Sequence, residues 1–164
     1  MTTPLNEQQS QDIASYAKEQ AQRVMSKIPL LGAVSWLMMQ HSATRHTLLS
    51  ELEWRVMPAL VLDQAKLFMR ESAPIAYVSW ARLSEDAAKR YQKAPHHLSA
   101  SDWKSGEQIW IVDMCTPFGG MQEVMKDLRE SVFPGQEIHQ FTLGGEGQIK
   151  AMTWPAVVKK REGS

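Results

Sequence analysis

The chain has 164 residues, of which 43% are hydrophobic and 22% charged, and this predicts one globular domain rather than a disordered chain. Its 18 Lys and Arg balance its 18 Asp and Glu, so no overall positive charge favours a nucleic-acid partner. The single cysteine, Cys115, excludes an internal disulfide, and no apolar run approaches the roughly 20 residues of a membrane span. No signal-peptide pattern occurs at the N-terminus, so we expect a soluble, cytoplasmic protein.

The N-terminal segment is expected to be helical. Thr2-Thr3-Pro4 is typical of a helix start, and Ile28-Pro29 of a helix end. The helix between them is weakly amphipathic, so we expect it to be an extension of the main domain. We therefore divide the chain into an N-terminal helical extension (1–29), a main domain (30–158) and a polar tail (159–164).

Two helices are predicted at the start of the main domain, over residues 30–40 and 47–57, because apolar residues recur there at helical spacing. Pro58 is expected to bend or end the second helix. Strands are predicted over 65–69 and 75–80, joined as a hairpin. Ser84 then has the character of an N-cap, with acidic residues after it.

The second half of the chain centres on the apolar run at residues 109–112, which is typical of a buried strand. Asp113 is expected to end that strand, and Gly119-Gly120 to turn the chain into a short helix. Residues 138–143 and 149–154 are predicted to form a second hairpin. This order of elements predicts an α+β fold with a mostly antiparallel sheet flanked by helices.

Asp113 is the first candidate for chemistry, because a carboxylate at the end of a buried strand needs a partner or a task. The alternative is that its side chain caps the following turn. His41 could act as a general base, since the imidazole pKa of about 6.5 lies near working pH. His41, Thr44 and Arg45 share a face if the helix continues through them, whereas His46 projects elsewhere. The alternative is a polar rim at a helix end.

Two further features carry weaker signals. Cys115 follows Asp113 by two residues, so an extended backbone puts both on one face. That arrangement allows a cysteine nucleophile, although a lone cysteine in a core strand is more often a small hydrophobic residue. Gly119-Gly120 before a helix lets backbone N–H groups approach an anion such as one phosphate.

Several motifs are specific in combination: Leu-Gly-Ala-Val-Ser-Trp-Leu at 31–37, Met-Pro-Ala-Leu at 57–60, Pro-Ile-Ala-Tyr-Val-Ser-Trp-Ala-Arg-Leu-Ser at 74–84, and Trp-Lys-Ser-Gly-Glu from 103 followed by Ile-Trp-Ile-Val-Asp and Pro-Phe-Gly up to 119. In these motifs the chain resembles the toxin-activating lysine acyltransferases that accompany RTX protoxins. The resemblance covers roughly residues 31–128. It implies a fold of the GCN5-related N-acetyltransferase type.

The resemblance also implies an activity and its partners. Such enzymes transfer a fatty acyl group from acyl carrier protein to internal lysines of a protoxin, use no further cofactor, hold no metal, and tend to form homodimers. Their catalytic pair is a histidine and an aspartate, and Asp113 stands at the aspartate position. The usual Ser-x-x-His pattern becomes His41-Ser42-Ala43-Thr44 here, so imidazole and hydroxyl have exchanged places.

We therefore predict His41 and Asp113 as the catalytic pair, with Thr44 as a nearby hydroxyl. His46 is the rival base, if the segment after Gln40 is looped. Gly119-Gly120 is predicted to hold the phosphate of the carrier's phosphopantetheine arm, which is an inference from the turn and not a family assignment. Two alternatives to acyl transfer stay open: an acyl-thioester hydrolase that uses Cys115, and a catalytically weak or inactive module that binds carrier or toxin.

Overall fold

The computed structural model describes residues 3–94 and 97–158, so the polar tail predicted at 159–164 lies outside the described residues. Five strands form one sheet in the order of the chain, antiparallel throughout except between the third and fourth strands. The predicted α+β fold with a mostly antiparallel sheet is confirmed, and its likeness to GCN5-related acetyltransferases stays a prediction. The strands are β1 (Ala65–Arg70), β2 (Ala73–Leu83), β3 (Gln108–Cys115), β4 (Ile138–Leu143) and β5 (Ile149–Trp154).

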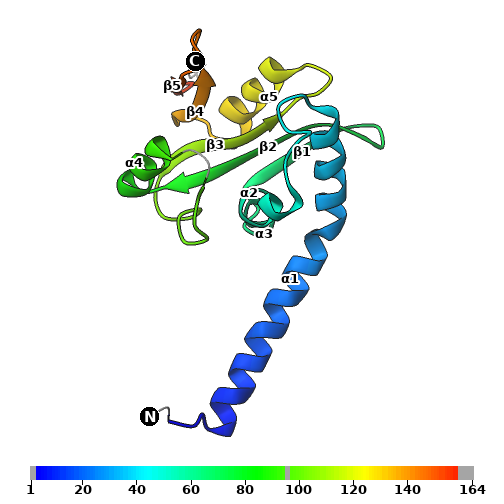
Figure 1. Cartoon of the computed structure of the whole chain (residues 1–164), viewed down its shortest axis with the longest axis vertical. Helices are drawn as coiled ribbons and strands as arrows, with labels where there is room; N and C mark the ends of the chain where they lie inside the picture. The colour runs from blue at the N-terminus through cyan, green and yellow to red at the C-terminus, as the bar shows by residue number, and fades with distance from the viewer. Residues whose placement is uncertain (1–2, 95–96, 159–164) are drawn as a thin grey trace, which may run out of the picture.

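Helices cover both faces of the sheet (Figure 1). The short helix α5 lies on one face, and the end of α1 packs with α2 and α3 on the other. A 3-10 turn over Leu49–Glu51 precedes α2, and a π-helical turn over Leu128–Val132 continues α5. The helices are α1 (Glu7–Gln40), α2 (Leu52–Arg55), α3 (Met57–Val61), α4 (Glu85–Lys93) and α5 (Met121–Asp127).

The buried core follows the alternation of β2. Ala76, Val78 and Trp80 face the α5 side, where Phe133 meets Trp80 edge-on with ring centroids 5.1 Å apart. Tyr77 faces the opposite side and packs against the end of α1. Successive side chains of a strand point to opposite faces, so one strand serves both layers of the core.

The helix break predicted at Ile28-Pro29 is wrong, because α1 runs without interruption from Glu7 to Gln40. Proline costs a helix about 3 kcal/mol, and the apolar turns that follow it compensate by burying Val34, Leu37 and Met38. The helix start predicted at Thr2-Thr3-Pro4 is wrong as well. Asn6 is the N-cap: its side chain accepts from the Gln9 N–H at 2.7 Å, and its own N–H donates to the Gln9 side chain at 3.1 Å.

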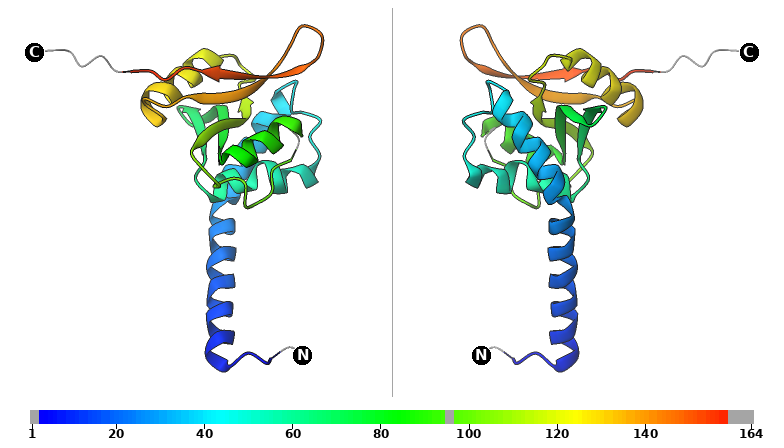
Figure 2. Two further views of the ribbon diagram at one scale, coloured as in Figure 1. Left: turned by 90° about the vertical axis from the view of Figure 1, so that its left-hand side faces the viewer. Right: turned by 90° about the vertical axis from the view of Figure 1, so that its right-hand side faces the viewer.

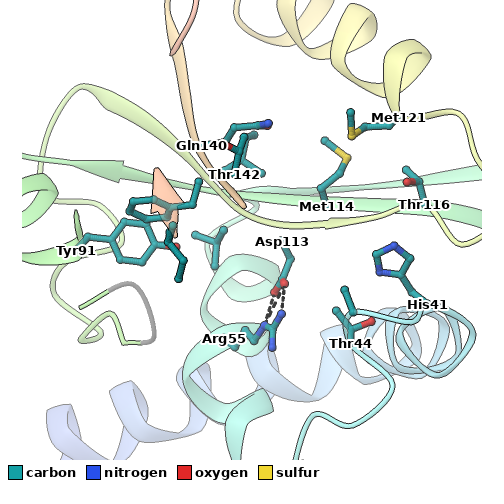
Figure 3. Close-up of a pocket in the computed structure, with 15 residues that line it drawn as sticks. His41, Thr44, Arg55, Tyr91, Asp113, Met114, Thr116, Met121, Gln140 and Thr142 are labelled. Atoms are coloured by element: carbon teal, nitrogen blue, oxygen red, sulfur yellow. Dashed lines mark hydrogen bonds and ion pairs between the residues drawn. The ribbon is translucent and has the colours of Figure 1, made fainter. Parts of the chain in front are cut away.

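The single helix predicted over 47–57 is also wrong. The chain instead forms the short turns of Leu49–Glu51, α2 and α3, with Pro58 in the first turn of α3. Pro58 has no N–H to donate back into the preceding turn, which separates α2 from α3. These short turns place Arg55, the last residue of α2, beside Asp113 of the sheet (Figure 3).

The two predicted hairpins and the Ser84 cap are confirmed. Strands β4 and β5 have the predicted bounds, and the Ser84 hydroxyl accepts from the Ala87 N–H at 3.1 Å. The predicted buried strand at 109–112 is β3, the third strand of the sheet, but it continues beyond Asp113 to Cys115. No helix within the described residues has the length and hydrophobicity to cross a membrane.

Candidate active site

A bulge in β3 decides the direction of Asp113. Ile111 pairs with Trp80 and Asp113 with Ser79, so Val112 is one residue more than β2 can match. By simple alternation Asp113 would share the face of Ile111, which is the α5 core. An extra residue shifts the alternation by one, and Asp113 and Cys115 therefore lie on the side of α1 and α2.

Asp113 is buried and bound by Arg55. Its side chain is 5% exposed and that of Arg55 is 22% exposed. The Arg55 Nε–H lies 3.0 Å from one carboxylate oxygen and 2.9 Å from the other, and Nη2 donates to the first as well. Nη1 of Arg55 donates to the Thr47 hydroxyl at 3.3 Å. The predicted alternative, an Asp113 that only caps a turn, does not describe this ion pair.

Burial and pairing act on this carboxylate in opposite directions. Burial raises the pKa of Asp113 above its ordinary value, while the hydrogen bond and charge of Arg55, and then the charge of His41, counter part of the rise. Burial alone would lower the pKa of Arg55, but its hydrogen bond to Asp113 and the charge of that carboxylate raise it overall. The guanidinium therefore stays charged beside Asp113.

Arg55 is the site residue that the sequence reasoning missed. A buried carboxylate requires a counter-charge or donors, and that signal could have prompted a search for a cation. Arg55 is the cation inside the apolar stretch Trp54–Leu60 that precedes the hairpin. Nothing in its spacing from Asp113, 58 residues further along the chain, points to the pairing.

A cleft opens where β3 and β4 part. The described pairing between these parallel strands is limited to Ile109 with Ile138 and Trp110 with His139. Beyond these pairs the two strands form opposite walls of a cleft of about 520 Å³. One end of it is polar, with His41, Thr44, Arg55 and Asp113 (Figure 3). The rest has apolar side chains such as Tyr91, Ile111, Met114 and Phe141, together with the polar side chains of Thr116, Gln140 and Thr142.

His41 and Thr44 both face this cleft, although the helix they were expected to share ends at Gln40. His41 is the C-cap residue, with an extended backbone, and its ring points toward the cleft (Figure 3). Its Nδ1 is buried and has no hydrogen-bond partner among the described residues. The buried Thr44 hydroxyl donates to the Met38 carbonyl at 2.9 Å, so the turn at 41–46 holds both side chains at the rim.

The other predicted residues lie away from the cleft. The segment after Gln40 is a turn, as the His46 alternative required, but His46 is exposed and does not line the cleft. Cys115 is fully buried against α1. Burial raises the pKa of its thiol to about 11, so Cys115 is a small core residue, as its strand position suggested.

Gly119 and Gly120 line a second hollow of about 310 Å³ together with Arg70 and Phe118. Both glycines have positive φ, +84° and +91°, and Gly120 is the residue before α5. Only glycine adopts such angles without strain, so the predicted turn is confirmed. The hollow adjoins the main cleft across this turn, because Thr116 and Met121 on either side of it line the cleft.

A protein-family comparison matches residues 23–155 to the RTX toxin acyltransferase family. The chain belongs to this family. The match includes β3, the turn after it and all the cleft residues named above. The first 22 residues, which contain most of the exposed part of α1, lie outside it.

Relatives with assigned names agree with this membership. The chain is 37% identical over 101 residues to the RTX-II toxin-activating lysine-acyltransferase ApxIIC of Actinobacillus pleuropneumoniae, covering 62% of this chain and 63% of that protein. It is 38% identical over 123 residues to the leukotoxin-activating lysine-acyltransferase LtxC of Aggregatibacter actinomycetemcomitans, covering 73% of each. It is 35% identical over 109 residues to the protein-lysine myristoyltransferase HlyC of Escherichia coli. The chain thus aligns with less than two thirds of the length of ApxIIC and of HlyC, 63% and 64%.

Proposed function

We propose that this protein transfers a fatty acyl group from acyl carrier protein to internal lysines of an RTX-type protein. The observation that carries the proposal is the meeting of His41 and the buried Asp113 at the polar end of an apolar cleft, in a chain of the RTX toxin acyltransferase family. The names of three relatives state lysine acylation or myristoylation of proteins. The carrier-bound thioester is the activated donor, so no other cofactor is invoked.

His41 is the proposed general base. A lysine ammonium must lose a proton before its nitrogen attacks the thioester carbonyl, and a neutral imidazole accepts a proton near neutral pH. The ring of His41 suits this task because it lines the cleft. The C–N bond then forms, the C–S bond breaks, the proton held on His41 passes to the carrier thiolate, and the second proton of the lysine nitrogen is released to water as the amide forms.

Asp113 acts on His41 through charge, not through a direct hydrogen bond. Its carboxylate binds Arg55, and a positive charge on the His41 ring favours the ionised form of Asp113 and so lowers the Asp113 pKa. An anion in a dry site stabilises the imidazolium that forms during the reaction. Thr44, at the position of the family histidine, completes the polar end with its hydroxyl turned to Met38.

The two hollows provide room for the two parts of the donor. The apolar wall formed by side chains such as Met114 and Phe141 suits an acyl chain, whose burial is favourable by about 0.8 kcal/mol per CH₂. We place the phosphate of the carrier arm at Gly119-Gly120, where Arg70 is the available cation and the Glu123 carboxylate also lines the hollow. Only the Gly119-Gly120 turn lies between the two hollows, so an extended carrier arm that binds in one hollow can pass the turn and reach into the other.

The first experiment is mass spectrometry of an RTX-type substrate incubated with the protein and acyl carrier protein loaded with a fatty acid. Acylated lysines are expected with the wild type. His41→Ala should lower the rate by about a hundredfold or more, whereas His46→Ala, a surface change, should leave it unaltered. Full activity of His41→Ala together with loss in His46→Ala would make His46 the base.

Restoring the imidazole at position 44 gives the converse test. Thr44→His should raise the rate if the exchange of His41 and Thr44 has moved the base, because a misplacement of about 1 Å can cost about a hundredfold in rate. The variant loses the bond from Thr44 to Met38, so Thr44→Val serves as the control for that loss. A rate below that of Thr44→Val would show that His41 already occupies the working position.

The Arg70 assignment is tested by steady-state kinetics with the acylated carrier. Arg70→Ala should raise KM for the carrier with little change in kcat, because the phosphate is remote from the reacting carbonyl. Lys18→Ala, which removes a cation from the projecting part of α1, is the control. Equal kinetics of the two variants would remove Arg70 from the donor site.

One observation favours a second candidate, a carrier- or toxin-binding module without turnover. Both oxygens of Asp113 are engaged by Arg55, and the family histidine position holds Thr44. Binding of acylated carrier without any transfer would identify this function. A hydrolase that uses Cys115 is not proposed, because this thiol is fully buried and lies outside the described lining of the cleft.

A further inference from the structure

The cleft between β3 and β4 has a different lining on each face of the sheet. Ile138 of β4 packs in the core on the α5 side, and Phe141 packs against the core on the opposite side, beside α4. Successive side chains of a strand point to opposite faces, so Gln140 and Thr142 lie on the α5 side. The hollow at Gly119-Gly120 lies on that side as well, because its lining includes side chains of the same core.

On the opposite side the cleft ends against aromatic rings. Helix α4 lies close beside the hairpin of β4 and β5 (Figures 1 and 2), and Tyr91 of α4 lines the cleft at the end away from His41 (Figure 3). The Tyr91 ring meets Phe141 of β4 and Trp110 of β3 edge-on, with ring centroids 5.0 Å and 5.9 Å apart. The rings of Trp110 and Phe141 are 5.2 Å apart. Each ring therefore contacts the other two, and we refer to Tyr91, Trp110 and Phe141 as the aromatic cluster.

The core behind the aromatic cluster fixes its position. Tyr91 is 4% exposed and Trp110 2% exposed, and both pack in one buried group with Trp103. His139 of β4 also stacks on the Trp110 ring, with centroids 5.0 Å apart. Protein cores are close-packed, and an added methylene forces side chains out of their preferred rotamers. The aromatic cluster is therefore a firm end wall, which does not yield to a longer occupant.

On the donor path proposed above, the end of the acyl chain meets this wall. The carrier arm passes from the Gly119-Gly120 hollow into the cleft on the α5 side, where Gln140 and Thr142 offer partners for its amide groups. The thioester then lies beside His41. An acyl chain that continues in the same direction runs toward Tyr91, on the other side of the sheet. The aromatic cluster thus closes the cleft where the last carbon atoms of the chain lie.

We propose that the aromatic cluster sets the longest acyl chain that the protein accepts. The inference rests on the proposed transfer of a fatty acyl group, and it adds the residues that select the length of that group. A chain that ends before the rings buries all of its methylenes, whereas a longer chain must displace a ring or bend back toward water. One methylene too many or too few in an apolar pocket changes a rate by about 10–200-fold, so the upper limit of chain length should be sharp.

Substitution of Phe141 tests this limit, because Phe141 is the half-buried member of the aromatic cluster. Acyl carrier protein is loaded with saturated chains that increase in length by two carbons, and mass spectrometry measures the rate at which each chain reaches the lysines of an RTX-type substrate. Beyond the limit of the wild type, the rate is expected to fall at least about tenfold. Phe141→Ala should move the limit to a longer chain, and Phe141→Trp should move it to a shorter one.

His139→Ala is the matched control. It removes another ring that contacts Trp110, from the same strand and the same face, but His139 is not part of the described lining of the cleft. The limit should therefore stay where the wild type has it. Circular dichroism checks that all variants are folded. An unchanged limit in Phe141→Ala and Phe141→Trp, or an equal shift in His139→Ala, would overturn the proposal.

Binding separates this inference from the proposed transfer. Calorimetry measures the dissociation constant of each acylated carrier, relative to the unacylated carrier, for the wild type and Phe141→Ala. If no chain is transferred but the length that binds most tightly increases in Phe141→Ala, the transfer is wrong and the length limit stands. If chains are transferred with the same length profile by both proteins, the transfer stands and the length limit is wrong. A wild type that neither transfers an acyl chain nor binds any acylated carrier more tightly than the unacylated one would contradict both.

Discussion

Two arginine–aspartate pairs in this protein have the same chemistry and opposite consequences. Arg55 and Asp113 meet in the cleft, where the side chains are 22% and 5% exposed. Arg90 of α4 meets Asp102 with Nη2 and Oδ1 2.9 Å apart, and here the arginine is 64% exposed while the Asp102 side chain is 10% exposed. Burial raises the pKa of Asp113 overall. Burial also acts to raise the pKa of Asp102, but its bonds to Arg90 and Ser99 outweigh this and lower it.

The comparison shows that the exposure of the arginine and the further donors to the carboxylate together decide in which direction its pKa moves. In the Arg90–Asp102 pair the ionised carboxylate is stabilised at less cost, because water still solvates the Arg90 guanidinium and Ser99 donates to Asp102 as well. In the cleft the desolvation of Asp113 costs more free energy than its bonds to Arg55 give back. The ionised form of Asp113 is therefore destabilised there. A group kept in this state is typical of a functional site. The predictions below separate the two pairs.

The largest effect is expected from Arg55→Ala. It leaves Asp113 buried without a counter-charge and should lower the free energy of unfolding by about 3–5 kcal/mol. Urea unfolding measures this loss. Replacing both partners, as in Arg55→Leu/Asp113→Leu, should recover much of it because no charge is left buried. A double variant no more stable than Arg55→Ala would show that the loss came from packing rather than from charge.

The pH dependence of stability should have opposite signs at the two aspartates. The raised pKa of Asp113 means that its contribution is greatest at acid pH and is lost as pH rises through the folded-state pKa. Asp113→Asn should therefore gain stability relative to the wild type as pH rises above about 4. Asp102 has a lowered pKa, so Asp102→Asn should lose relative stability as pH rises toward the same value. Unfolding curves across pH 2.5–7, chosen to bracket the ordinary carboxyl pKa of about 3.9, test both signs, and equal signs would contradict the comparison.

Cys115→Ala tests whether Cys115 contributes only to stability or also to acyl transfer. Cys115 is fully buried and outside the described cleft lining. The variant should lose about 1 kcal/mol of stability, near the value of one buried methylene, and keep its rate of acyl transfer. Urea unfolding and mass spectrometry of the substrate measure the two quantities. A large fall in the rate of acyl transfer without a loss of stability would show that Cys115 takes part in the reaction.

The smallest effect is expected from Arg90→Ala. Asp102 keeps the Ser99 N–H at 3.1 Å as a partner, and an exposed arginine contributes little. The unfolding midpoint should change far less than in Arg55→Ala, and high salt should abolish the difference from the wild type. A change as large as that of Arg55→Ala would show that exposure does not distinguish the two pairs.

The sequence alone determined the elements whose signals are local. The bounds of β4 and β5, the Ser84 cap and the turn at Gly119-Gly120 all follow from patterns within a few residues, because alternation, capping groups and positive φ act over short distances. The family motifs identified Asp113 in the same way. The structure brings His41 and Thr44 to the same cleft as Asp113, through a turn and not through the continued helix that the sequence suggested, and their roles stay a prediction.

The tertiary structure decided the rest. Pro29 predicts a helix end locally, and only the burial of the turns after it makes the continuous α1 favourable. A single unmatched residue, Val112, turns Asp113 from the α5 core toward Arg55, and no sequence pattern marks it because its cause lies in the pairing with β2. The contact between Arg55 and Asp113 joins residues 58 positions apart. Such a contact forms because a buried charge must find a partner wherever the folded chain brings one.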